Sequence, residues 1–387
     1  MGPSGFTIPL RYAALSGKGK AKANEAMKED EMRKHRKLDF RFTMRAWFCA
    51  AICILWLAVP ATAQRPTIIT YDAPGAGTAA GQGTFAGYVN DWGVITGWYV
   101  DSNGLSHGYI RYPHGGFASF DAPGATGGTW GIFPNNKGQI QGIYFDSVGM
   151  HGFVRSARGA ITEFDFPNSP GGTYAQAFND AGVVTGLGWD TNGLSHGFVR
   201  SPDGNFTEFD PPGLGTGCSG VFNFSCGTWP LSINSEGAIT GYFVNSNGAV
   251  VGFVRAADGG MTEFENCANC AGYWINNAGE IVGQSNSNSF LRDRRGSITM
   301  FSVPGAGTTF GWAMNEANIV TGWWLDTNNA SHGFVRAPDG RITKFDAPGA
   351  GTGAGQGTTP ENINDAGTIS GLYVDNSNVT HGFIRLP

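Results

Sequence analysis

Beyond residue 66 the chain is a succession of short apolar segments separated by turns rich in Gly, Asn, Asp and Pro. Short segments in which apolar and polar residues alternate predict β-strands rather than helices. The segments recur around one asparagine, which is followed three residues later by a turn residue. This asparagine occurs as Asn90, Asn135, Asn179, Asn234, Asn276, Asn315 and Asn364. The pattern therefore predicts a β repeat protein with seven copies of one unit.

The N-x-x-G motif that begins at each asparagine predicts a tight turn between two strands. Glycine stands at its last position, as in Gly93 and Gly138, in every copy except the sixth, where Asn318 replaces it. Gly and Asn are the residues that best tolerate a left-handed backbone. We therefore expect a type I turn closed by a left-handed residue, with a β-strand on either side.

The strand before each turn has the strictest spacing. The residue four positions before the asparagine is always small or Pro, and the residue six positions before it is Thr, except for Cys270 in the fifth copy. Such spacing is typical of a crowded inner strand. Aromatic residues recur five positions before the asparagine, as Phe85, Trp130, Tyr174, Trp229 and Phe310. We interpret them as packing between neighbouring copies, with a ligand-facing ring of aromatics as the alternative.

Each copy continues with three further strands. The second ends in glycine, as in 183–186, the third reads H-G-F-V-R, as in 196–200, and the fourth follows a P-D-G turn, as in 206–210. The last copy has no fourth strand. Residues 67–72, before the first copy, read as a fourth strand that has no first three strands ahead of it. Pairing 67–72 with 382–385 completes the last copy and removes an exposed sheet edge. The predicted fold class is all-β, a seven-bladed β-propeller of four-stranded antiparallel blades with the ring closed by the N-terminal strand.

The motifs I-N-[DN]-x-G, V-x-G and H-[GA]-F resemble the extracellular HAF-type repeats of bacterial exported proteins, over residues 65–387. Two features depart from that family. Its histidine is followed by Ala, whereas here Gly follows His107, His151, His196, His332 and His381, and the D-x-P-G segments such as 72–75 are also unlike its plainer form. The resemblance implies an exported, propeller-like repeat protein and assigns no activity.

The first 63 residues differ in composition from the rest. We interpret the highly charged residues 1–43 as disordered or as lying upstream of the true start at Met44. Residues 44–63 combine Arg45, an apolar run and an A-x-A site, which predicts a signal peptide cleaved before Gln64. An uncleaved membrane anchor is the alternative. We expect 64–387 to form a single domain that is secreted, periplasmic or at the cell surface, without a membrane span after cleavage.

Charge narrows the range of partners. Residues 64–387 contain 14 Lys and Arg against 25 Asp and Glu, so their formal charge is −11. Nucleic acid and anionic membranes repel such a body, and we expect neither as a partner. The expected partner is an extracellular glycan, peptide or protein, bound by a monomer.

Four cysteines follow the signal peptide, and an even number in an exported chain favours disulfides. We predict the pairs Cys218–Cys226 and Cys267–Cys270, with cross-pairing between adjacent copies as the alternative. The C-x-x-C spacing at 267–270 also suits half of a zinc site, but the other two cysteines have poor spacing for one.

Residues shared by the copies are interpreted as structural. The repeated histidines would be spread around a ring, too far apart to converge on one metal ion. Arginine ends the third strand of every copy, from Arg111 to Arg385, and we expect it to bridge to acidic residues of neighbouring strands. Loops such as 101–104 resemble half of a calcium loop but lack its distal ligands. We expect no metal and no cofactor, with calcium as the alternative.

A ligand is expected where the copies depart from the repeat. The candidate ligand-binding residues are Gln176, Phe222, Phe224, Tyr273, Trp274, Glu361 and Asn362. No nucleophile motif, carboxylate pair or phosphate loop is recognisable, so no catalytic residue is assigned. The predicted function is a non-catalytic binding or interaction propeller for an extracellular glycan or peptide. A carbohydrate- or peptide-active lyase or hydrolase is the first alternative, and a cell-surface structural protein is the second.

Overall fold

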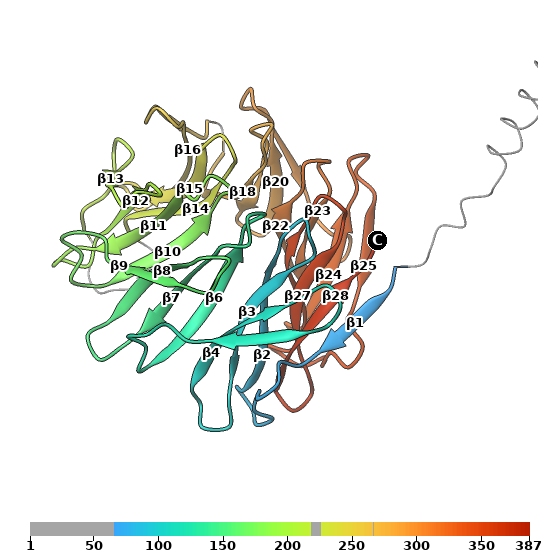
Figure 1. Cartoon of the computed structure of the whole chain (residues 1–387). Coiled ribbons are helices and arrows are strands. Elements are labelled where there is room, and N and C mark those ends of the chain that lie inside the picture. Colours follow the sequence, from blue (N-terminus) through green and yellow to red (C-terminus); the bar gives the residue numbers. More distant parts are fainter. Residues whose placement is uncertain (1–65, 218–225, 266) are drawn as a thin grey trace, which may run out of the picture. The chain divides into compact units, whose positions relative to one another are not determined.

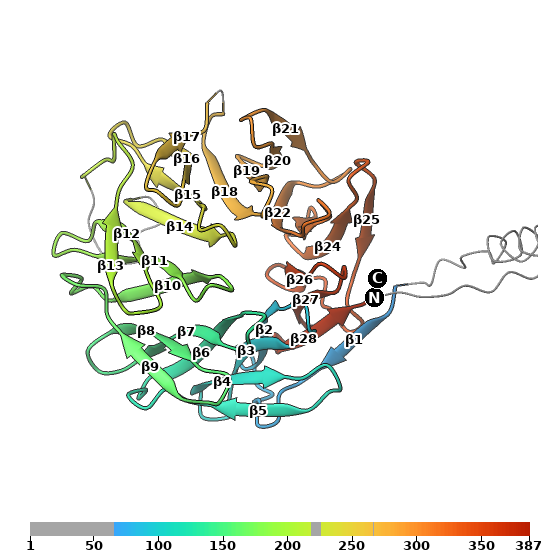
Figure 2. The ribbon, with the colours of Figure 1, turned by 45° about the horizontal axis from the view of Figure 1, so that its top comes forward.

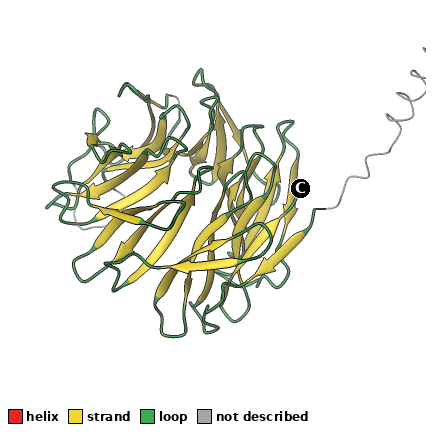
Figure 3. Ribbon diagram, viewed as in Figure 1, coloured by secondary structure: helices red, strands yellow, loops and turns green. Residues whose placement is uncertain are grey.

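The computed structural model describes residues 66–217, 226–265 and 267–387. Residues 1–65, which include the expected extension and signal peptide, lie outside the described residues. The described residues form 28 strands and no helix (Figures 1 and 3). They accordingly include no helix long and apolar enough to cross a membrane.

Four strands follow one another in each copy, as the pattern predicts. The first strands are β2 (Gly83–Val89), β6 (Gly128–Pro134), β10 (Thr173–Phe178), β14 (Thr228–Ile233), β18 (Cys270–Ile275), β22 (Thr308–Met314) and β26 (Gly357–Ile363). The second strands are β3 (Ile95–Val100), β7 (Ile140–Phe145), β11 (Val184–Trp189), β15 (Ile239–Val244), β19 (Ile281–Ser285), β23 (Val320–Leu325) and β27 (Ile369–Val374). The third strands are β4 (Ser106–Arg111), β8 (Met150–Arg155), β12 (Ser195–Arg200), β16 (Val250–Arg255), β20 (Asn288–Arg292), β24 (Ser331–Arg336) and β28 (Thr380–Arg385). The fourth strands are β5 (Phe117–Phe120), β9 (Ile161–Phe164), β13 (Phe206–Phe209), β17 (Met261–Glu263), β21 (Ile298–Phe301), β25 (Ile342–Phe345) and β1 (Ile68–Tyr71).

Neighbouring strands of a copy pair in sequence order. Four sheets contain four strands each, namely β6–β9, β10–β13, β14–β17 and β18–β21. The other strands form one larger sheet, in which short parallel bridges join β24 to β26 and β28 to β2. Strand β1 pairs with β28, with Ile68 opposite Arg385 and Tyr71 opposite Gly382. Figure 2 shows the sheets around a common centre, with the first strands innermost.

The turns after the first strands have the backbone that the sequence predicts. Gly93 has a φ of 74°, and Asn318, which replaces glycine in the sixth copy, has a φ of 59°. The asparagine that begins each turn accepts backbone hydrogen bonds through its side-chain oxygen. The Asn90 oxygen accepts from the Trp92 and Val94 N–H groups at 3.1 and 2.9 Å. The side chain therefore fixes its own turn.

The amide nitrogen of the same asparagine connects one copy to the next. Asn90 donates to the backbone carbonyl of Asn135, and Asn364 donates to that of Asn90, both at 3.0 Å. The same bond occurs at four further junctions. At the remaining junction the Asn276 amide donates to the side-chain oxygen of Asn318 at 2.9 Å. These bonds hold neighbouring first strands at a fixed separation.

The arginines that end the third strands do not bridge to acidic residues, so that expectation is wrong. Each guanidinium carbon lies 4.5–5.1 Å from the centroid of an aromatic ring in the fourth strand of the preceding copy, or, for Arg292, directly after that strand. Arg111 lies over Tyr71, and Arg155 lies over Phe120. The region between two sheets offers a π-face at this point, and the cation–π contact packs one sheet against the next.

The same aromatic rings explain why glycine follows the repeated histidine. A Cβ atom on Gly152 would lie 2.3 Å from the ring of Phe164, and one on Gly333 would lie 2.7 Å from that of Phe345. Ring atoms held between two sheets cannot move aside, so these positions exclude even alanine.

We expect Asn90→Ala to lower the free energy of unfolding by about 2–4 kcal/mol, because it removes two bonds within the turn and one to the next copy. Asn103, an exposed asparagine in another turn, provides the control, and Asn103→Ala should change stability by less than about 0.5 kcal/mol. Urea unfolding of both variants measures the difference. Equal stability of the two variants would contradict this role of Asn90.

Candidate functional site

Each first strand contains a β-bulge shortly before its turn. In β10 the register with β11 shifts between Ala175 and Ala177, so Gln176 has no partner residue across the pair. The same irregularity occurs in the other first strands, and in β2 it includes both Gly87 and Tyr88. A bulge redirects a side chain and is common beside functional sites.

The bulged residues line a single cavity of about 340 Å³ among the first strands. They are Gly87, Tyr88, Ile132, Gln176, Leu231, Tyr273, Trp312 and Glu361. Seven different residue types stand three positions before the seven asparagines. Seven similar backbones therefore build one asymmetric cavity wall.

Aromatic rings make up most of this wall. Trp98 stacks on Trp130 with ring centroids 4.6 Å apart, and Tyr273 lies 4.9 Å from Trp312. The other aromatic lining residues are Tyr88, Tyr174, Trp229 and Tyr242. The wall is thus largely aromatic, which suits a ligand with apolar or cationic surface.

Three of the five aromatics that stand five positions before the asparagine line the cavity as well, so for these three the interpretation from sequence was incomplete. Trp130, Tyr174 and Trp229 line the cavity, and Trp130 and Tyr174 are half-buried. These rings are large enough to pack between two first strands and also to reach the cavity.

Glu361 and Gln176 supply the wall's carboxyl and amide groups. Glu361 is half-buried, and its removal from water raises its pKa to about 8, although the Trp312 indole N–H hydrogen-bonds the carboxylate and opposes the shift. The Gln176 Oε1 atom has no hydrogen-bond partner among the described residues. No Lys, Arg or His is among the described residues that line the cavity.

Three stacked rings separate this cavity from a second one. Tyr88 stacks on Phe133 with centroids 3.7 Å apart, and Trp274 lies 5.9 Å from Tyr88. On the far side, the turn asparagines surround a cavity of about 190 Å³ whose rim includes Asp91 and Asp365. Tyr88 lines both cavities, so the ring stack forms the floor of the aromatic one.

The structure places three of the predicted ligand residues, Gln176, Tyr273 and Glu361, in the aromatic cavity. Trp274 belongs to the ring stack, and Asn362 lines the second cavity, where its Oδ1 accepts from the Val89 N–H at 3.3 Å. Phe222 and Phe224 lie outside the described residues, and their role remains a prediction.

Several lining residues were missed from the sequence, above all Trp312, Leu231 and Tyr88. Trp312 and Leu231 occupy the same position in the repeat as Gln176, three residues before the asparagine. Comparing the copies at that one position would have identified them, because it is where all seven differ.

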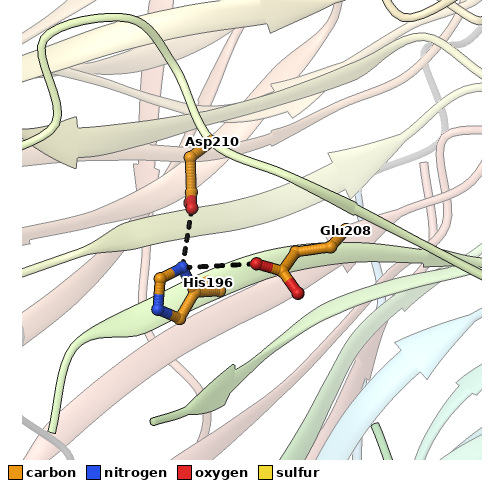
Figure 4. A group of neighbouring side chains, drawn as sticks. All are labelled: His196, Glu208 and Asp210. Carbon is orange, nitrogen blue, oxygen red and sulfur yellow. Dashed lines mark hydrogen bonds and ion pairs between the residues drawn. The ribbon is translucent and has the colours of Figure 1, made fainter. Parts of the chain in front are cut away.

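The repeated histidines form a peripheral set of contacts. Figure 4 shows His196, whose Nδ1 lies 2.6 Å from Asp210 and 3.7 Å from Glu208. The three side chains place ligand atoms within 4.8 Å of one another, as a metal site would. However, the same His–Asp pair recurs in four other copies, as between His107 and Asp121 at 3.0 Å. A contact repeated in this way ties the third strand to the segment after the fourth.

Other residues noted in the sequence have local structural roles. The Asp101 side chain accepts from the Asn103 and Leu105 N–H groups at 2.8 and 2.9 Å, so the loop is a hydrogen-bonded turn. Cys267 and Cys270 form a disulfide, as predicted. Cys226 is buried and disulfide-bonded, but Cys218 lies outside the described residues, so the pair Cys218–Cys226 remains a prediction.

The fold is similar to solved structures, whereas the sequence matches no protein-family model and no curated protein. Virginiamycin B lyase from Staphylococcus aureus superposes with a TM-score of 0.56 at 15% identity, over 84% of this chain and 100% of that one. The β-propeller domain of the Trilobed protease from Pyrococcus furiosus gives a TM-score of 0.53 at 8% identity, over 80% of this chain and 94% of that one. The chain has a β-propeller fold. At these identities the similarity extends to the fold alone.

Glu361 should make the stability of this propeller depend on pH. Its pKa of about 8 in the folded protein compares with an ordinary value of 4.5. Between those values the folded state retains a proton that the unfolded state has released, so the free energy of unfolding falls as pH rises from about 5 to about 8. We expect Glu361→Gln, which cannot titrate, to gain stability over the wild type as pH rises.

Thermal melts at pH 5 and pH 8.5 measure this effect, which amounts to about 1.4 kcal/mol per unit of pKa shift. Glu236→Gln, at an exposed carboxyl, is the control and should show the same difference from wild type at both pH values. A Glu361→Gln variant that behaves like this control would contradict the raised pKa.

Proposed function

We propose that this protein is a non-catalytic binding propeller that holds an extracellular glycan or peptide in its aromatic cavity. The observation that carries the proposal is the bulge. The first-strand position at which all seven copies differ is the position whose side chains line the cavity. A repeat that serves only its own stability has no need of seven different residues at one place.

The composition of the cavity supports a binding role. Ligand sites are concave and mostly apolar, with a few polar groups that orient the ligand. Here the aromatic wall supplies the apolar surface, and Glu361 and Gln176 supply polar groups. A cavity of about 340 Å³ suits a compact group, such as one sugar ring or one side chain of a peptide.

A seven-bladed ring closed by β1 is the architecture that we propose for this site. Contacts between β26 and β2, and the hydrogen bond from Asn364 to Asn90, support closure of the ring. The pairing of β1 with β28 supplies a fourth strand to the last blade. Closure matters for function because the cavity wall takes residues from all seven first strands.

We also propose that the protein is exported, through a signal peptide at 44–63, and that it is an HAF-type repeat protein. The disulfide between Cys267 and Cys270 supports export, since such bonds persist in oxidising compartments. An extracellular location in turn favours a ligand such as a glycan or peptide.

A lyase or hydrolase is the second candidate, and Glu361 is the observation that favours it. A carboxyl whose pKa is about 8 can donate a proton at neutral pH. Most glycosidases, however, use two carboxyl groups, and Glu361 is the only one among the described lining residues. The binding role therefore accounts better for the wall.

Glycan and peptide arrays probed with the mature chain test the binding proposal. We expect a ligand whose affinity falls at least tenfold in Leu231→Trp, because the larger ring at a bulged position fills the cavity. Trp92→Ala is the control, since Trp92 is 71% exposed and lies in a turn outside the aromatic cavity. Ligands that bind equally well to Leu231→Trp, or the absence of any ligand, would contradict the proposal.

A further inference from the structure

One ionisable group dominates the electrostatics of the aromatic cavity. Among the described lining residues, Glu361 is the only one that titrates near neutral pH. Burial raises the pKa of Tyr174 and of Tyr273 to about 12, and it raises those of Tyr88 and Tyr242 as well. The four phenols therefore stay neutral, and the cavity's own charge is either zero or −1.

Aromatic rings lie close to this carboxyl group. The charge of Glu361 raises the pKa values of Tyr88 and Tyr174, and the Trp312 indole N–H hydrogen-bonds the carboxylate. The faces of such rings attract cations, and cages of Trp and Tyr recognise quaternary ammonium groups. A carboxylate beside several rings adds a full negative charge to that attraction.

The described residues supply no cation of their own to this place. The described lining residues include no Lys, Arg or His, and the arginines of the third strands lie over the rings of fourth strands instead. A buried carboxylate without a cationic partner is costly, as the raised pKa of Glu361 reflects. A cationic ligand would remove that cost.

The scarcity of acceptors distinguishes among cations. A guanidinium presents five N–H donors and a primary ammonium three, and each donor needs an acceptor once it leaves water. Apart from the phenol oxygens, the side-chain acceptors of the wall are the Glu361 carboxylate and the unpartnered Gln176 Oε1. An ammonium whose hydrogens are replaced by alkyl groups makes few such demands and places its methyl groups against the rings.

We infer that the cavity binds an alkylated ammonium group, with the Glu361 carboxylate as its counter-ion and the Tyr88, Tyr174 and Trp312 rings as its cage. This inference rests on the proposed function, since it takes the cavity to be the ligand site. The group is carried by a small molecule or by a larger glycan or peptide. The formal charge of −11 over 64–387 attracts a cationic ligand of either kind.

Binding of the cation requires Glu361 to lose its proton, so affinity should rise with pH. Below the pKa of about 8, each pH unit should change the dissociation constant by up to tenfold. The facing groups from the other strands are Tyr88 of β2, Tyr174 of β10, Tyr242 of β15 and Tyr273 of β18, which stay neutral from pH 6 to 8. Above pH 8 the affinity should level off.

Titration of the mature chain with choline, followed by tryptophan fluorescence and calorimetry, tests the inference. The control ligand is 3,3-dimethylbutan-1-ol, which has the shape of choline without its charge. We expect choline to bind at least tenfold more tightly than the alcohol at pH 8, and the difference to shrink at pH 6. Glu361→Gln should abolish both the preference and its pH dependence while still binding the alcohol.

The outcomes separate this inference from the proposed function. Equal affinity for choline and the alcohol, or tighter binding of neutral sugars than of choline, would overturn the inference of a cationic ligand. The cavity would still be a ligand site. A lack of binding by every probe would overturn both. A peptide with trimethyllysine and a glycan with phosphocholine, compared with free choline, identify whether a larger carrier adds affinity.

Discussion

The hydrogen bond from each turn asparagine to the next copy sets how closely the innermost strands approach. Asn90 and Asn364 make this bond at 3.0 Å, and the asparagines at four further junctions make it at 3.0–3.3 Å. At such close approach there is little room for side chains. A Cβ atom on Gly311, four residues before Asn315, would lie 2.8 Å from Val282. The small residue or Pro at this position of each copy is consistent with that crowding.

The bulge relieves the crowding and also creates the site. By adding one residue to each first strand, it directs a side chain away from the packed sheets and toward the centre. Residues that recur have structural roles: the arginines over aromatic rings pack one sheet against the next, and the histidines paired with Asp tie the third strand to the segment after the fourth. The bulged residues, such as Glu361, Gln176 and Trp312, line the cavity instead. Stability and ligand recognition thus depend on different positions of the same repeat.

Local signals were enough to predict the strands, the turns and the pairing of 67–72 with the last copy. The turns were predictable because Gly93 and Asn318 are residue types that adopt a left-handed backbone. The pairing was predictable because 67–72 read as a fourth strand and the last copy lacks one. The site was harder to predict, because the rule that alternate side chains of a strand point to the same face holds only for an uninterrupted strand. The bulge at Tyr273 interrupts it, and the adjacent Trp274 consequently lies in the ring stack. The partner of each arginine was missed because it belongs to the neighbouring sheet, at a distance that no local pattern encodes.

The central claim is that the aromatic cavity binds a cationic group between the Glu361 carboxylate and the Tyr88, Tyr174 and Trp312 rings. A crystal structure of the protein grown with arsenocholine, in which arsenic replaces the nitrogen of choline, tests it most directly. The account predicts an anomalous arsenic peak inside the aromatic cavity, beside Glu361 and bounded by Tyr88 and Trp312. A peak at the acidic rim formed by Asp91 and Asp365, with the aromatic cavity empty of arsenic, would contradict it.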